Sequence, residues 1–148
     1  DFGQQRGLIM GTRIWREFLK PRLAQMYQRV HELGMHVWIH SCGDNSPIME
    51  DLIEIGVDVY NPFQPEAHDV YALKREYGAR IAFEGGIGTQ QLLPRGTPEE
   101  IRAEIQRLCR EVGRGGGFIL APTKPIMPDV PTENAVACVE AILQQAGH

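Results

Sequence analysis

The sequence predicts an α/β fold in which one leading helix is followed by four β-α units. Three observations lead to this prediction. Short apolar segments typical of strands alternate with longer segments whose apolar residues recur at helical spacing. Most helical segments end at a glycine. The polar residues that could act in catalysis or ligand binding follow the strands. Alternation at this pace implies a parallel sheet with right-handed crossovers.

Length and composition narrow the class of protein. With 148 residues, 43% hydrophobic and 23% charged, the chain has the composition of one ordinary globular domain, residues 1–148. A net charge of −4 gives no basic surface for nucleic acid, and no apolar run approaches membrane-spanning length. Three widely spaced cysteines argue against a disulfide framework and for the reducing cytoplasm. Because the chain opens on Asp1 without Met, we expect part of a longer protein.

The first third of the chain is expected to hold one helix and one strand. Residues 1–10 are rich in glycine and predict irregular structure. Thr12 is a suitable N-cap for a helix that Pro21 should kink or restart and that stops at Gly34. A strand then covers residues 35–41.

Three further β-α units follow at similar spacing. Ser46-Pro47 opens a helix ending at Gly56, residues 57–61 form a strand, and residues 68–77 form the next helix. A strand over 80–84 runs into the Gly85-Gly86-Ile87-Gly88 turn. Thr97-Pro98-Glu99-Glu100 has the pattern of a capping box, and its helix ends in the glycines of 113–117. Residues 118–121 predict the last strand and residues 132–146 the last helix.

Two features favour half of an eight-stranded TIM-type barrel over a doubly wound sheet. First, the chemically interesting residues fall at or just beyond strand carboxyl ends, where barrel enzymes place their sites; these residues are His40, Cys42, Asn61, Glu84 and Lys124. Second, the glycine turn lacks the G-x-G-x-x-G spacing of a dinucleotide site. Half a barrel leaves two open edges, so we expect a partner: an N-terminal barrel half or a second copy.

His40 and Cys42 form half of a possible soft-metal site. Side chains alternate along a strand, so these two share a face opposite Val37 and Ile39. Two ligands are too few for zinc, and a packed histidine beside an inert thiol is the alternative interpretation. The Glu84 carboxylate could complete a His/Cys/Glu set with water as the fourth ligand. Among the remaining residues, Cys109 and Cys138 are expected in the core, and His31 and His68 at the surface or at caps.

Several motifs occur in order along the chain, among them Trp15-Arg16-Glu17-Phe18, His40-Ser41-Cys42-Gly43, Phe83-Glu84-Gly85-Gly86-Ile87, Gly116-Gly117-Phe118-Ile119-Leu120-Ala121-Pro122 and Pro128-Asp129-Val130-Pro131. Taken together, they resemble the C-terminal half of the uroporphyrinogen decarboxylase family, which also includes zinc-dependent methyltransferases acting with corrinoid proteins. The resemblance implies a TIM-type barrel, in agreement with the pattern of elements.

The resemblance implies a first activity, decarboxylation of tetrapyrrole acetate groups in porphyrin biosynthesis, a lyase reaction without an added cofactor. Lys124 stands where family methyltransferases carry a third zinc ligand, a cysteine, and where decarboxylases carry a histidine. A lysine cannot replace a thiolate on zinc, but it can act as a cation beside carboxylates or as a proton donor. Lys124 and Glu84 are therefore the candidate catalytic residues.

The alternatives are a zinc methyltransferase acting on a corrinoid or a thiol, with His40 and Cys42 on the metal, and a non-catalytic ligand-binding relative. A tetrapyrrole or corrinoid is the expected small-molecule partner. The candidate substrate-binding residues are Gln5, Asn61, Gln64, Gly85 and Gly86. In the family, key Asp and Arg groups come from the N-terminal half, so this chain alone should not turn over.

Overall fold

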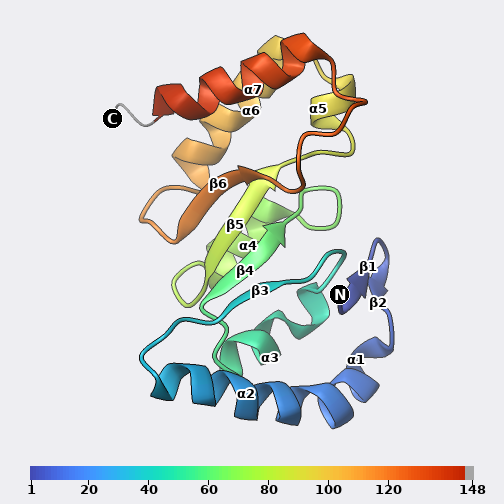
Figure 1. The fold of residues 1–148 in the computed structure, drawn as a ribbon, viewed down its shortest axis with the longest axis vertical. Coiled ribbons are helices and arrows are strands. Elements are labelled where there is room, and N and C mark those ends of the chain that lie inside the picture. Colours follow the sequence, from blue (N-terminus) through green and yellow to red (C-terminus); the bar gives the residue numbers. More distant parts are fainter. Residues whose placement is uncertain (146–148) are drawn as a thin grey trace.

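A computed structural model describes residues 1–145. Its centre is a parallel sheet with strand order β3-β4-β5-β6, which confirms the predicted α/β class and the half of a TIM-type barrel (Figure 1). The strands are β3 (Trp38–His40), β4 (Val59–Phe63), β5 (Ala82–Ile87) and β6 (Phe118–Pro122). The helices are α1 (Gly11–Ile14), α2 (Lys20–Glu32), α3 (Met49–Glu54), α4 (Val70–Tyr77), α5 (Leu92–Arg95), α6 (Pro98–Glu111) and α7 (Thr132–Gln145).

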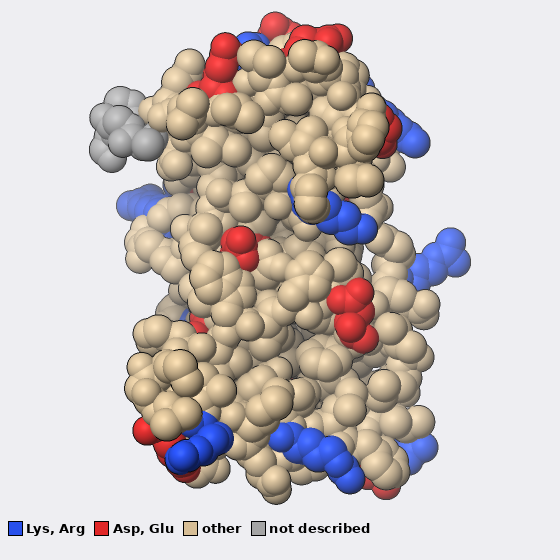
Figure 2. Space-filling model, in the orientation of Figure 1, with Lys and Arg blue, Asp and Glu red and all other residues tan. Residues whose placement is uncertain are grey.

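One face of the sheet is covered by helices and the other is open. In Figure 1, α4 lies behind β4 and β5 and α3 lies below β3, while none of the helices described for residues 1–145 lies in front of the strands. The strands alternate accordingly: Ile39, Tyr60 and Phe83 are buried on the helix side, whereas Trp38 and Ile119 are 54% and 42% exposed. Figure 2 shows that the centre of this view is mostly uncharged. An uncovered inner face is what half of a barrel presents.

The core behind the sheet is aromatic at its centre. Phe63 and Phe83 are fully buried and stack with ring centroids 4.2 Å apart. Tyr60, also fully buried, meets Phe83 edge-on at 6.3 Å. Because these residues lie on neighbouring strands, the stack fixes the two central strands against the helices. Cys138 is buried and Cys109 half-buried, as expected for packed thiols.

The N-terminal segment differs from the prediction. Residues 1–10 were expected to be irregular, but they contain an antiparallel hairpin of β1 (Gly3–Gln4) and β2 (Gly7–Leu8). Between α1 and α2 the chain makes a π-helical turn, Trp15–Leu19, immediately before Pro21. This turn carries the fully buried Trp15, which packs against the hairpin.

Two predicted boundaries are wrong: β5 continues through Gly85, Gly86 and Ile87, which were predicted as a turn, and α1 begins at Gly11 without a cap from Thr12. Other boundaries lie within a few residues of the prediction. The predicted capping box is present: Thr97 Oγ1 accepts from Glu100 N at 3.2 Å, and Glu100 Oε2 accepts from Thr97 N at 2.8 Å. The helix predicted from Ser46 begins as a 3₁₀ turn, Ser46–Ile48, and the short α5 was not predicted. The last helix was predicted to residue 146, which lies outside the described residues. Within residues 1–145, none of the helices combines the length and apolar character that a bilayer span requires.

Candidate metal site at the carboxyl ends of the strands

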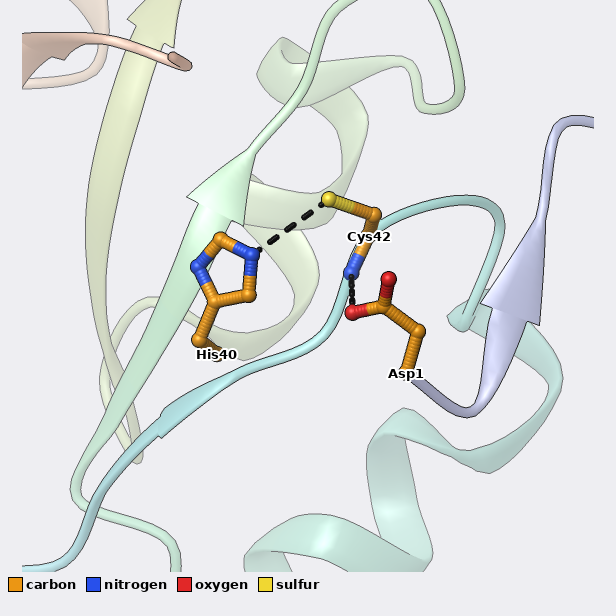
Figure 3. A group of neighbouring side chains, drawn as sticks. All are labelled: Asp1, His40 and Cys42. Carbon is orange, nitrogen blue, oxygen red and sulfur yellow. Dashed lines mark hydrogen bonds between the residues drawn. The ribbon is translucent and has the colours of Figure 1, made fainter. Parts of the chain in front are cut away.

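Three potential ligands meet where β3 ends. His40 is the last residue of β3, and the backbone then turns so that Cys42 Sγ lies 3.4 Å from His40 Nε2. Asp1, at the start of the hairpin, turns its carboxylate toward the same point and accepts a hydrogen bond from Cys42 N at 2.9 Å (Figure 3). One ligand atom from each of the three lies within 4.8 Å of the others.

The second ring nitrogen of His40 is held by the neighbouring strand. The parallel register pairs His40 with Asn61, and His40 Nδ1 lies 2.5 Å from Asn61 Oδ1. The imidazole is therefore held between Asn61 on one side and Cys42 on the other.

Hydrogen bonds of its backbone attach the hairpin segment to the loop after β3, and one aromatic contact attaches it to the π-helical turn Trp15–Leu19. Phe2 N donates to Ser41 Oγ at 2.8 Å, and Asp44 N donates to Gln4 O at 2.9 Å. The Phe2 ring meets the buried Trp15 ring edge-on at 5.7 Å. Gly43 has a φ of +81°, and a Cβ there would lie 2.4 Å from Gln4 N, so only glycine allows this close approach. These contacts place Asp1 beside Cys42.

A buried polar network supports the same loop from behind. Asn45 is fully buried, and its Nδ2 donates to Ser41 O and to Tyr60 Oη, both at 2.9 Å. Tyr60 Oη in turn donates to Ser41 O at 3.1 Å and lies 3.2 Å from His68 Nε2. His68 was predicted at the surface or at a cap; it is buried instead because it packs edge-on against Tyr60. Burial lowers the pKa of His68, so it packs as a neutral ring.

The open side of the site is a pocket of about 630 Å³, lined by His40, Cys42, Asn61, Pro122, Thr123, Lys124, Pro125 and Ile126. Lys124 is exposed in this pocket, and none of the ion pairs found within residues 1–145 includes it. A larger hollow, about 920 Å³, lies beside α5 and α6; of the predicted site residues it contains only Gly86. The pocket on the strand ends therefore brings together four predicted residues: His40, Cys42, Asn61 and Lys124.

The other predicted site residues lie outside this pocket. Glu84 accepts a hydrogen bond from Trp38 Nε1 at 3.0 Å, so its carboxylate is directed along the open face instead of toward Cys42. Gln64 is buried, and its Oε1 faces Gly43 N at 3.5 Å. Gln5 is exposed at the tip of the hairpin, and Gly85 and Gly86 are buried in β5.

Asp1 is the site residue that the sequence did not indicate. It comes before the hairpin and belongs to no helical or strand pattern, so only the docking of the hairpin shows its position. Its neighbour Phe2, an aromatic residue among glycines and polar residues, was the available signal that this segment packs against the domain.

The donor atoms suit a zinc ion. Thiolate, imidazole and carboxylate are the three ligand types that zinc takes in proteins. Zn–S and Zn–N bonds of about 2.3 and 2.05 Å at a tetrahedral angle separate sulfur from nitrogen by about 3.6 Å. The distance of 3.4 Å between Cys42 Sγ and His40 Nε2 is close to that value. With three protein ligands, a tetrahedral zinc ion would have a fourth position free, as in catalytic zinc sites.

The chain is similar to known proteins over most of its length. The family described as uroporphyrinogen decarboxylase (URO-D) matches residues 4–145. The uroporphyrinogen decarboxylase of Thermus thermophilus is 29% identical over 133 residues, 89% of this chain and 37% of that protein. The methylcobamide:CoM methyltransferase of Methanosarcina barkeri is 28% identical over 133 residues, 90% of this chain and 37% of that protein. The solved structure of a methyltransferase from Methanosarcina mazei superposes with a TM-score of 0.66 at 28% identity, covering 90% of this chain and 37% of that one.

Proposed function

We propose that this chain, which belongs to the uroporphyrinogen decarboxylase family, provides the metal-binding half of a zinc-dependent methyltransferase. The observation that carries the proposal is the convergence of Asp1, His40 and Cys42 beside an open pocket. We place this activity ahead of decarboxylation, the first activity expected from the sequence, because the Asp1 carboxylate lies within 4.8 Å of the potential ligand atoms of His40 and Cys42.

The residues divide the work as follows. His40, Cys42 and Asp1 would hold the ion, and His40 and Cys42 also line the pocket. A zinc ion bound there would deprotonate a thiol that coordinates it and keep the sulfur as a thiolate nucleophile. Lys124, which lines the same pocket, offers its ammonium group to an anionic part of the substrate.

Metal analysis and titration test the proposal. Purified chain from zinc-supplemented growth should carry about one zinc per molecule, and Co²⁺ should give a thiolate-to-metal charge-transfer band. Cys42→Ser should lose the band, and Cys109→Ser, which changes a thiol on α6, should retain it. Less than about a tenth of an equivalent of zinc per chain, with no cobalt band, would refute the proposal.

Decarboxylation remains the second candidate because Lys124 places a cation in the same pocket. In that role the ammonium would bind a substrate carboxylate, and no metal would be needed. Spectral titrations separate the candidates: a corrinoid should bind to the complete methyltransferase, and a porphyrin to the complete decarboxylase. In either case a reducing compartment such as the cytoplasm suits three free thiols.

A second barrel half is the partner that we propose. The chain spans about 37% of the length of the relatives it matches. β3 and β6 are the outer strands of the sheet, and apolar side chains are exposed on both flanking helical layers. These side chains are Ile14, Phe18 and Met26 at one end and Val136, Val139 and Leu143 at the other. Analytical ultracentrifugation of this chain alone should detect self-association; a monomer that persists at all concentrations would count against open, pairing edges.

A further inference from the structure

We infer that Asn61 is a positioning residue that fixes the neutral His40 ring in the tautomer with its proton on Nδ1. The inference rests on the proposed metal site, because its consequence is that Nε2 presents a lone pair to the ion. Asn61 thus acts through His40 and needs no contact with metal or substrate.

The geometry of the two strands carries the inference. The register of β3 and β4 pairs His40 with Asn61, and Asn61 Oδ1 lies 2.5 Å from His40 Nδ1. An amide oxygen has no hydrogen to give, so it accepts and the ring nitrogen donates. A neutral imidazole has one N–H, and placing it on Nδ1 leaves Nε2 with its lone pair. Nε2 is the atom that faces Cys42 Sγ at 3.4 Å.

The tautomer needs to be imposed because a free histidine side chain in water favours the proton on Nε2. A histidine in that form would turn an N–H toward Cys42 and could not bind a metal through that atom. An acceptor at Nδ1 reverses the preference, which is how ligating histidines are oriented in metal proteins.

A neighbouring carboxylate that could take this role is occupied elsewhere. Tyr60 pairs with Phe83, so Glu84 follows on β5 in the row next to Asn61. Its Oε2, however, accepts from Trp38 Nε1 at 3.0 Å. The acceptor for His40 is therefore an uncharged amide. It orients the ring through the contact between His40 Nδ1 and Asn61 Oδ1.

The test reads the tautomer directly in the metal-free chain. Long-range ¹H–¹⁵N correlation spectra of protein labelled with ¹⁵N-histidine distinguish Nδ1–H from Nε2–H, and His40→Gln assigns the signal. We expect Nδ1–H in the parent protein, a shift of the population to Nε2–H in Asn61→Leu, and Nδ1–H again in Asn61→Asp. In Co²⁺ titrations, Asn61→Leu should bind about 10- to 100-fold more weakly, and Asn61→Asp should recover most of that loss.

Each outcome bears on one of the two claims. Nε2–H in the parent protein, or Nδ1–H retained in Asn61→Leu, would overturn the role of Asn61 whatever the metal affinity. A purely structural role would lower the urea midpoint of Asn61→Leu and leave its tautomer unchanged, which would also overturn the inference. An Nδ1–H tautomer in a protein that binds neither Co²⁺ nor Zn²⁺ would support the role of Asn61 and refute the proposed metal site.

Discussion

Replacing Asn45 by alanine should loosen the loop that carries Cys42. Asn45 is fully buried behind this loop, and its side-chain amide reaches Ser41 O and Tyr60 Oη at 2.9 Å.

The expected cost follows from those bonds. Each neutral hydrogen bond contributes about 1 kcal/mol, and an acceptor left buried without a donor adds about 1–3 kcal/mol. Tyr60 Oη still donates to Ser41 O in the variant. Asn45 Oδ1, which has no hydrogen-bond partner within residues 1–145, is removed with the side chain, and this offsets part of the loss. We therefore expect Asn45→Ala to lower the free energy of unfolding by about 2 kcal/mol.

Urea unfolding followed by circular dichroism measures this change. With an m-value of about 2 kcal/mol per molar urea, the midpoint should fall by about 1 M. A loop that regains the backbone freedom of one residue also costs about 1–2 kcal/mol on metal binding, so Co²⁺ affinity should fall about tenfold.

Asn134→Ala is the matched control. Asn134 is also buried, its Nδ2 donates to Leu93 O at 2.9 Å and Gly96 O at 2.8 Å, and its Oδ1 has no partner. The control should lose about the same stability and keep its Co²⁺ affinity. The reasoning fails if Asn45→Ala lies within about 0.5 kcal/mol of the parent, or if Asn134→Ala weakens Co²⁺ binding equally.

Three further changes test other parts of the structure. Gly43→Ala puts a Cβ 2.4 Å from Gln4 N at a φ of +81°, so limited proteolysis should cut the displaced hairpin faster than in the parent protein. Burial raises the pKa of the Asp51 carboxyl, but hydrogen bonds from Arg16 and Lys20 lower it by more, so that this pKa lies below its ordinary value. The ionised Asp51 stabilises the fold at neutral pH, and this stabilisation is lost as pH falls through the lowered pKa. Asp51→Asn should therefore flatten the acid limb of a plot of the free energy of unfolding against pH. At pH 7 the variant should lower that free energy by about 1.5–3 kcal/mol. Phe83→Ala empties a fully buried position in the aromatic stack and should lower the free energy of unfolding in urea by about 3–5 kcal/mol; a loss below about 1 kcal/mol would contradict the packing.

Regular elements were predictable from the sequence because their signals are local. The capping box at Thr97 and the alternation around Ile39 depend on neighbouring residues, and both are present. It was also predictable in outline that Cys42 and Lys124 line the same pocket. Carboxyl ends of parallel strands lie at one edge, so residues that follow β3 and β6 approach each other without any sequence signal for contact.

The features that the sequence did not predict depend on contacts between segments that are distant in the sequence. The two-residue strands of the hairpin are too short to show alternation, so neither the hairpin nor the position of Asp1 was visible. Glu84 was expected beside Cys42, but the indole of Trp38, 46 positions earlier, binds its carboxylate. His68 was expected at the surface or at a cap because it lies in a helical segment, but it is buried and packs edge-on against Tyr60. Each difference comes from a partner that periodicity cannot identify.

The approach of Asp1 to Cys42 makes any shared ion a cross-link within the chain. Joining residues 1 and 42 closes a loop of about 40 residues, and the chain-entropy relation for such closures gives about 4 kcal/mol of stabilisation. An ion bound by both residues would then hold the N-terminal hairpin segment, residues 1–10, against the sheet as a disulfide would, but reversibly. A chelator would act as the reductant does for a disulfide, releasing the arm and lowering the melting temperature together.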